Sequence, residues 1–246
     1  MIKLGNPFIQ LLEVDSTNNY AHRLIKTGLA DSGTAIFAAQ QTHGKGQMGK
    51  KWQANKGENI TLSIIANIST VHLQNQFGLV AMAALGCYDF FNRYAIDATA
   101  IKWSNDLYWN DKKAGGILIE TLQHHQQRFA IIGIGININQ PIFDPNLPNP
   151  VSLKQITGKH FDVVALAQEL CVCIDKWYNV LLQGDHHLLL ETYNQHLYKK
   201  DNIVTLKKGN IKFNCTIKAV AANGELQVEN GLQDSFQFGE VEWQLK

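Results

Sequence analysis

The chain has 246 residues, of which 45% are apolar and 17% are charged, so it can bury a sizeable core. Its 22 basic and 21 acidic residues leave a net charge of +1, which disfavours a protein that binds nucleic acid by neutralising phosphates. No uncharged apolar segment approaches the roughly 20 residues that a bilayer requires, and the start of the chain lacks a signal-peptide pattern, so we expect a soluble, cytoplasmic protein without a membrane partner.

The first elements in chain order are a helix and two strands that flank a loop. Ser16-Thr17-Asn18 precede apolar residues at helical spacing as far as Leu29, so one of the two hydroxyl residues is the expected N-cap. β-rich segments at 34–41 and 59–68 enclose a glycine-rich loop at 43–57. The loop is therefore held by a strand at each end.

The middle of the chain predicts a long helix followed by three strands. Apolar positions at 73–94 fit an amphipathic helix. Strands are expected up to Trp103, at 115–122 and at 128–138, joined by polar turns. A loop rich in Pro and Asn at 140–150 then ends the sheet.

Two helices and a small β-rich segment complete the chain. Residues 162–182 have helical periodicity with Asp162 as the N-cap, and a shorter helix is expected around 185–198. From residue 201 onward, short alternating segments are separated by Gly-Asn and Asn-Gly turns, which predicts a five-stranded β-barrel of SH3 type.

These elements predict an α+β protein in which a mixed β-sheet is backed by helices and followed by a small SH3-like β-barrel. We place the catalytic domain at 1–198 and the C-terminal domain at 199–246. The cysteines lack the CxxC spacing of many metal sites, so we interpret them as reduced structural thiols. They are Cys87, Cys171, Cys173 and Cys215.

The segment from Gln41 to Trp52 is the most informative, because its three glycines and three lysines suit a backbone that closes on an anion. It resembles two common nucleotide-binding patterns but departs from both. Lys51 replaces the Ser or Thr of a phosphate loop, and neither the helix nor the distant acidic residue of a dinucleotide-binding turn follows. The alternative is a flexible surface loop with solvated lysines.

Polar residues at the ends of the later strands form a second group. Lys102, Asn105, Asp106 and Lys113 surround a tight turn and can converge on one ligand, although solvated lysines and ordinary turn chemistry also explain them. Asn137 lies in an apolar strand, where its amide must find hydrogen bonds from the protein or from a ligand.

Taken in order, these segments resemble the biotin protein ligase family. The matching segments are Ser16-Thr17-Asn18, Gln41 to Gly46 with Gly49 and Trp52, Lys102 to Leu107, Lys113 to Leu118, and Gly133 to Asn137. The resemblance is close over residues 13–140 and implies a class II synthetase-like catalytic domain. Only fifteen residues precede Ser16, so we expect the short form without the N-terminal DNA-binding domain.

The resemblance implies an ATP-dependent biotin–protein ligase. Such an enzyme forms biotinyl-5'-AMP from biotin and Mg-ATP, and then transfers biotin to a lysine of the biotin carboxyl carrier protein domain of a carboxylase. Biotin and Mg-ATP are then substrates, no cofactor is tightly bound, and a homodimer is possible. The alternatives are a lipoate–protein ligase or octanoyl transferase of related fold, and a non-catalytic biotin-binding module.

The resemblance also assigns residues to roles. The catalytic set is Lys45, Lys113 and Asp106, with Asp106 as the magnesium ligand. The biotin set is Ser16, Thr17, Asn18, Gln41, Gly44, Lys45, Lys113, Gly115 and Gly116. The ATP set is Lys45, Gln47, Trp52, Lys102, Asn105, Asp106, Lys113 and Asn137. The chain departs from the family pattern in two places, since Ser104 replaces a usual Pro and Gln47 replaces a frequent Arg.

Overall fold

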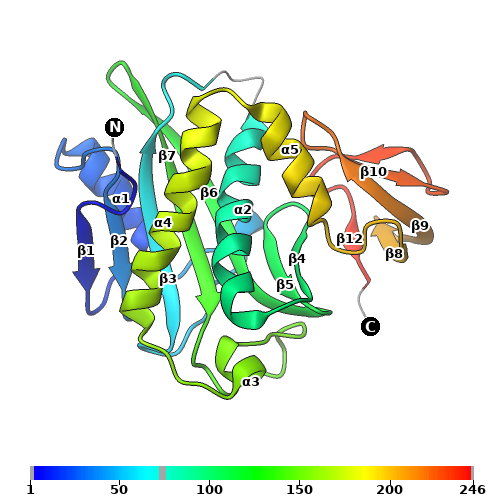
Figure 1. The fold of residues 1–246 in the computed structure, drawn as a ribbon, viewed down its shortest axis with the longest axis horizontal. Helices are drawn as coiled ribbons and strands as arrows, with labels where there is room; N and C mark the ends of the chain where they lie inside the picture. Colours follow the sequence, from blue (N-terminus) through cyan, green and yellow to red (C-terminus); the bar gives the residue numbers. More distant parts are fainter. Residues whose placement is uncertain (1–2, 72–75, 245–246) are drawn as a thin grey trace.

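The computed structural model describes residues 3–71 and 76–244, which form a seven-stranded sheet with helices on both faces and a separate five-stranded sheet (Figure 1). The order in the large sheet is β1-β2-β3-β7-β6-β5-β4, and β1 with β2 is its parallel pair. Its strands are β1 (Phe8–Leu11), β2 (Ala35–Ala38), β3 (Asn59–Asn67), β4 (Thr99–Lys102), β5 (Asp106–Trp109), β6 (Lys112–His124) and β7 (Gln127–Asn137). The expected mixed sheet is therefore confirmed.

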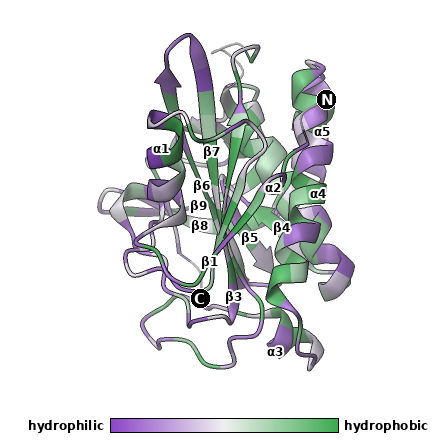
Figure 2. Cartoon of the chain, turned by 90° about the vertical axis from the view of Figure 1, so that its left-hand side faces the viewer, coloured by the Kyte–Doolittle hydropathy of each residue, from purple (hydrophilic) through white to green (hydrophobic). Residues whose placement is uncertain are grey.

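The helices cover the two faces of this sheet unequally. They are α1 (Thr17–Lys26), α2 (Gln76–Ala95), α3 (Leu153–Thr157), α4 (Val163–Leu182) and α5 (His186–Gln195). α1 lies on one face and α2 with α4 on the other, so that the sheet is seen edge-on between them in Figure 2. The alternation of side chains along β7 explains this arrangement, because Ile131 packs toward α1 while Ile132 and Ile134 pack toward α2 and α4.

Helix boundaries largely follow the expected caps. Ser16 is the N-cap of α1, but its side chain makes no capping hydrogen bond. Asp162 caps α4 by accepting hydrogen bonds from the amides of Val164 and Ala165. The start of the long helix predicted at 73 falls in 72–75, outside the described residues, and the described helix begins at Gln76.

Two strands, one α-helix and the short 3-10 helix η1 (Gln47–Gly49) were not predicted. β5 occupies the segment that we interpreted as a turn, because Asn105-Asp106 resembles turn chemistry while Leu107 and Tyr108 are buried in the sheet. β1 and α3 are also additional, and both are short.

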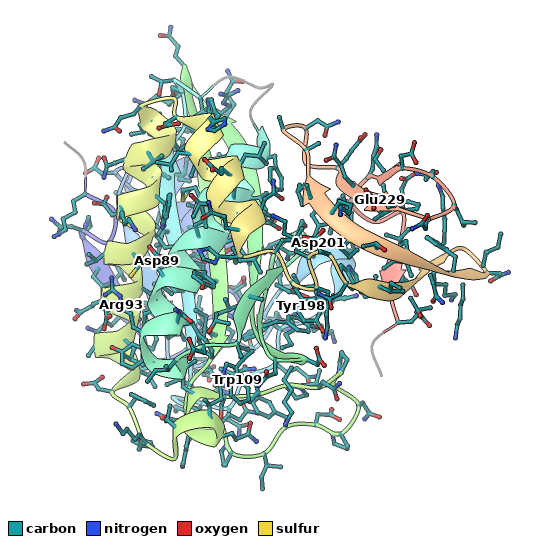
Figure 3. All side chains as sticks on the ribbon, turned by 45° about the vertical axis from the view of Figure 1, so that its right-hand side comes forward. Asp89, Arg93, Trp109, Tyr198, Asp201 and Glu229 are labelled. Carbon is teal, nitrogen blue, oxygen red and sulfur yellow. The ribbon has the colours of Figure 1, made fainter. Side chains whose placement is uncertain are left out.

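The C-terminal sheet has the order β11-β10-β9-β8-β12 and matches the expected five-stranded SH3-like barrel. Its strands are β8 (Ile203–Lys208), β9 (Ile211–Val220), β10 (Leu226–Glu229), β11 (Ser235–Phe236) and β12 (Glu242–Trp243). It packs on the first part of the chain, where the Trp103 indole N–H donates to the carbonyl of Gly224 at 2.9 Å. The boundary at 198/199 remains a prediction, next to Tyr198, which Figure 3 labels between the two parts.

The four cysteines are buried and unpaired, and burial raises the pKa of the Cys171 thiol to about 12. Within the described ranges, no helix has the length and apolar character needed to span a bilayer.

Candidate functional site

A hollow in the sheet, on the face that carries α1, is the centre of the site. Gly133 and Gly135 of β7 alternate with isoleucines that point to the opposite face, and Gly116 of β6 pairs with Gly135. The absence of side chains at these positions leaves a pocket between strands, α1 and the glycine-rich loop. A Cβ at Gly133 would lie 2.3 Å from the Asn18 Oδ1, so the hollow depends on glycine there.

The polar residues at the start of α1 form one wall of this pocket. Ser16, Thr17 and Asn18 all line it and are buried. Because the Ser16 hydroxyl does not cap the helix, it remains available to a ligand. Ser63 on β3 lies behind them, 2.7 Å from Thr17 Oγ1 and 2.6 Å from Asn18 Oδ1.

The second wall comes from Gln41 and the glycine-rich loop that follows it. Gln41 Oε1 accepts the backbone N–H of Thr17 at 2.8 Å, which directs its amide NH₂ away from α1. A Cβ at Gly44 would lie 2.4 Å from the Trp52 carbonyl oxygen, so the two ends of the loop can approach only with glycine at this position. Lys45 also lines the pocket, with Nζ 3.9 Å from Glu120 Oε1.

Glu120 joins the loop to α1. Its other oxygen accepts a hydrogen bond from Asn18 Nδ2 at 2.6 Å and lies 3.5 Å from His22 Nε2. Neither Glu120 nor Ser63 was among the residues predicted from the sequence.

Trp52 closes the pocket. A Cβ on Gly135 would lie only 2.3 Å from its Cε2, so the indole lies directly on the glycine hollow. The cavity that remains has a volume of about 30 Å³, and the indole Nε1 is buried without a hydrogen-bond partner in the described part of the chain. A volume of this size holds about one water molecule. A larger ligand therefore requires Trp52 and its loop to shift.

A charged region adjoins the hollow along one line of paired residues. The register pairs Gly135 with Gly116, Gly116 with Asp106, and Asp106 with Lys102 across four strands. Paired residues point to the same face of a sheet, so the glycine floor continues directly into the charged side chains. Lys113 Nζ lies 2.6 Å from Asp106 Oδ1.

Lys102 is held by aromatic rings from both parts of the chain. Its Nζ lies 5.2 Å from the ring centre of Tyr108 and 5.3 Å from that of Trp243 in β12. Burial lowers the pKa of Lys102 to about 8, while the nearby Asp106 carboxylate acts in the opposite direction. Lys113 and Lys50 lie close enough to contribute to the lowering.

Other predicted residues have structural partners. Asn105 Nδ2 donates to the Ile117 carbonyl at 2.6 Å, and Gln47 Nε2 approaches the same oxygen at 3.4 Å. Gln47 Oε1 is buried and has no hydrogen-bond partner among the residues that the structure describes. Asn137 Nδ2 donates to the carbonyl of Val151 at 3.1 Å, which ties β7 to the segment before α3.

The predicted residues thus separate into two adjoining groups and two outliers. Trp52, expected on the nucleotide side, has its indole in the pocket with Ser16 and Gln41. Asn137, also expected to meet the nucleotide, is buried and bonded to the protein backbone.

Within the described residues no group of three or more His, Cys, Asp or Glu side chains could hold a metal ion.

Comparison with known proteins identifies the family. Residues 12–137, just over half of the 246 residues, match the biotin/lipoate A/B protein ligase family. The chain belongs to that family. Membership accounts for the position of the site, because the matched residues include α1, the glycine-rich loop and strands β2 to β7.

Individual members of the family show how far the similarity extends. The bifunctional ligase/repressor BirA of Bacillus spizizenii is 34% identical over 179 residues, which are 71% of this chain and 54% of that protein. The chain thus spans about half the length of this relative. The biotin–[acetyl-CoA-carboxylase] ligase of Paracoccus denitrificans is 30% identical over 180 residues, which are 68% of this chain and 71% of that protein.

The fold is also shared with a solved structure over nearly the whole chain. The biotin protein ligase from Aquifex aeolicus, in complex with biotin and ATP, is 25% identical with a TM-score of 0.80. The match covers 98% of this chain and 100% of that one, so it includes the C-terminal barrel.

Proposed function

We propose that this protein is an ATP-dependent biotin–protein ligase. The observation that carries the proposal is the position of Gly116, which lines the polar pocket and also borders the ion pair. A Cβ on Gly116 would lie 3.4 Å from Asp106 Oδ1 and 3.5 Å from Lys113 Nζ. Once Trp52 has shifted, a ligand in the pocket can therefore extend across Gly116, which has no side chain, and present a carboxylate to Lys113.

The polar end of the pocket suits the ureido ring of biotin. Ser16, Thr17 and Gln41 provide hydroxyl and amide groups that can pair with its N–H and C=O groups. A lipoyl or octanoyl chain would leave these buried groups unpaired, which disfavours such ligands. Lys45, on the loop, lies beside the same pocket and can neutralise the carboxylate.

In the first step, a biotin carboxylate oxygen attacks the α-phosphorus of ATP and pyrophosphate leaves. Lys45 and Lys113 stabilise the negative charge on the carboxylate and phosphate oxygens. Lys102 lies nearby, because it pairs with Asp106 in the line of residues that begins at the glycine hollow. In the second step, the ε-amine of a carrier lysine attacks the acyl carbon of the adenylate, and AMP leaves with the acyl-bond oxygen. The two steps balance without a covalent enzyme intermediate.

Magnesium enters this reaction with ATP as part of the substrate. Mg²⁺ typically uses one or two protein carboxylates together with phosphate oxygens and water. Asp106 fits this pattern as a carboxylate in the charged row that also pairs with Lys113. It would hold the metal–phosphate complex, while the lysines provide the remaining charge.

The acceptor in this proposal is a biotin carboxyl carrier domain of a carboxylase, supported by the Paracoccus denitrificans relative, which is named a biotin–[acetyl-CoA-carboxylase] ligase. A homodimer remains a prediction from the resemblance, and a cytoplasmic location remains a prediction from the sequence.

Biotin-dependent exchange of pyrophosphate into ATP tests the proposal. Purified protein is incubated with labelled pyrophosphate, Mg-ATP, and biotin, lipoate or octanoate in parallel. We expect exchange with biotin and at least a hundredfold less with the two linear acids, because these leave the polar end unpaired. Equal exchange with lipoate or octanoate would refute the biotin assignment, and exchange with none would refute adenylation.

A further inference from the structure

A chain of hydrogen-bonding groups, buried at its centre, runs behind the pocket from β6 through α1 and β3. Glu120 Oε2 lies 2.6 Å from Asn18 Nδ2, and Asn18 Oδ1 lies 2.6 Å from Ser63 Oγ. Ser63 Oγ is 2.7 Å from Thr17 Oγ1, which is 3.1 Å from Gln41 Oε1. Ser63 is fully buried, and Thr17 and Asn18 are only 3% exposed. The contacts among these three side chains therefore exchange little with solvent.

The carboxylate determines the direction of the first two hydrogen bonds. An ionised carboxylate can only accept, so the amide of Asn18 must turn its NH₂ toward Glu120 and its carbonyl oxygen toward Ser63. A carbonyl oxygen can also only accept, so the single proton of Ser63 is donated to Asn18.

The same argument determines whether the Thr17 hydroxyl donates or accepts. With its proton used by Asn18, Ser63 can offer Thr17 only a lone pair, and Gln41 Oε1 is an acceptor as well. Thr17 must therefore donate its one proton within the protein, and its remaining lone pair faces the pocket. Gln41 Oε1 already accepts the Thr17 amide, so Gln41 presents NH₂ to the pocket.

We propose that Glu120 and Ser63 are positioning residues that make Thr17 an acceptor and Gln41 a donor toward the ligand. The pocket then requires an N–H opposite Thr17 and a carbonyl opposite Gln41. This inference rests on the proposed function and deepens it, because a cyclic urea has an N–H on each side of its carbonyl. Ligands with an acceptor at the N–H position are rejected by repulsion between lone pairs.

The test compares biotin with the two cyclic carbamate analogues in which one or the other ring N–H is replaced by oxygen. All three ligands keep the same acyl chain and carboxylate, so the ratio of their dissociation constants cancels interactions with Lys45 and Lys113. Calorimetric titration of the full chain measures this ratio for wild type, Ser63→Ala and Glu120→Gln. Thr61→Val is the matched control, since it removes another buried hydroxyl on β3, which donates to the Ala38 carbonyl.

In Ser63→Ala the Thr17 hydroxyl can rotate and donate to the carbamate oxygen. We expect the preference for biotin over one carbamate isomer to fall about tenfold, which corresponds to about 1.4 kcal/mol. Glu120→Gln permits the side-chain amide of Asn18 to rotate by half a turn, and it should lower this preference less than Ser63→Ala does. Thr61→Val should retain the wild-type ratio of dissociation constants. The Glu120 side chain is partly exposed, so this variant also tests the proposal if Ser63→Ala fails to fold.

A wild-type ratio in both Ser63→Ala and Glu120→Gln would overturn the inference and leave the proposed function intact. A fall of the same size in Thr61→Val would also overturn it, since the effect would then come from general loosening of β3. Wild-type protein that binds neither biotin nor carbamates would contradict both the proposed function and this inference.

Discussion

The two ends of the site differ in burial and in bonding. At the polar end, Thr17, Asn18 and Ser63 are buried and hydrogen-bonded to one another. At the charged end, Lys113 and Asp106 pair chiefly with each other and remain partly exposed. The two ends are adjacent, because Gly116 borders both. Buried, mutually bonded groups are costly to reorient, while partly exposed charges can readily exchange partners. We therefore expect the polar end to control which acid binds and the charged end to control how fast it reacts.

The largest effect should follow from Lys113→Ala, which removes the cation of the charged end. We expect the rate of biotin-dependent pyrophosphate exchange to fall a hundredfold or more, the loss typical when a preorganised charge on a developing phosphate is removed. Biotin affinity should change less, because the polar end is untouched. Lys112→Ala, at the exposed neighbour on β6, is the control. A loss below threefold in Lys113→Ala would mean that Lys113 is a solvated strand residue.

Gly116→Ala tests whether the two ends are continuous. The added methyl group would make ordinary contacts with Asp106 and Lys113, so the unfolding temperature should remain near that of wild type. In the occupied site, however, the methyl group would lie between the ring and the carboxylate of biotin. We expect the KM for biotin to rise at least tenfold, since overpacking typically costs about 1–3 kcal/mol. An unchanged KM would show that the ligand does not pass Gly116.

A smaller effect is expected at Gln47, where the family usually has Arg. A neutral amide is weaker than a charged donor by roughly 1 kcal/mol, so Gln47→Arg should slow release of the adenylate about fivefold. Lys50 lies close enough to Lys102 to influence it and can partly replace the missing charge.

Double-mutant analysis separates these contributions. Lys50→Ala should speed adenylate release in wild type and do so much less in Gln47→Arg, with Lys51→Ala as the control on the same exposed loop. The absence of any effect of Lys50→Ala in both backgrounds would rule out compensation.

The smallest effect concerns pH. Burial lowers the pKa of Lys102 to about 8, so the side chain is cationic below this pH and neutral above it. Its charged fraction falls from about nine-tenths at pH 7 to about one-tenth at pH 9, and kcat/KM for ATP should fall severalfold over this range. The same profile measured for Lys102→Met should be flat. An equal fall in that variant would assign the titration to another group.

The polar end also marks the limit of what could be predicted from the sequence. The motifs at Ser16 and Gln41 were recognisable because their order is distinctive. Ser63 and Glu120 lie outside those motifs, in strands that we interpreted only as β-rich. The register of β3 with β7 and of β7 with β6 brings them next to α1, where they contact Thr17 and Asn18. Strand register across different segments cannot be read from local periodicity. A polar Ser63 within an apolar strand was the available signal.

Trp52 and Asn137 show the converse limit, and their nucleotide roles stay predictions. Both were assigned to the nucleotide by resemblance, yet the position of Trp52 depends on its contact with Gly135, and the partner of Asn137 is a backbone carbonyl at Val151. A buried amide can be satisfied by protein or by ligand, and the residue type does not distinguish these cases. The sequence did contain a signal for the hollow. Gly133 and Gly135 alternate with isoleucines, and alternate residues of a strand share one face of the sheet.

The central claim is that one continuous site joins the polar and charged ends. Native mass spectrometry of the protein after incubation with biotin and Mg-ATP tests this claim most directly. The account predicts a complex that contains one biotinyl-5'-AMP and persists until a biotin carboxyl carrier domain is added, when AMP is released and the carrier gains one biotinyl group. Lys113→Ala should bind biotin in the same experiment without forming the adenylate. If wild-type protein binds biotin and ATP but produces no adenylate, or releases AMP at full rate without any carrier, the central claim is contradicted.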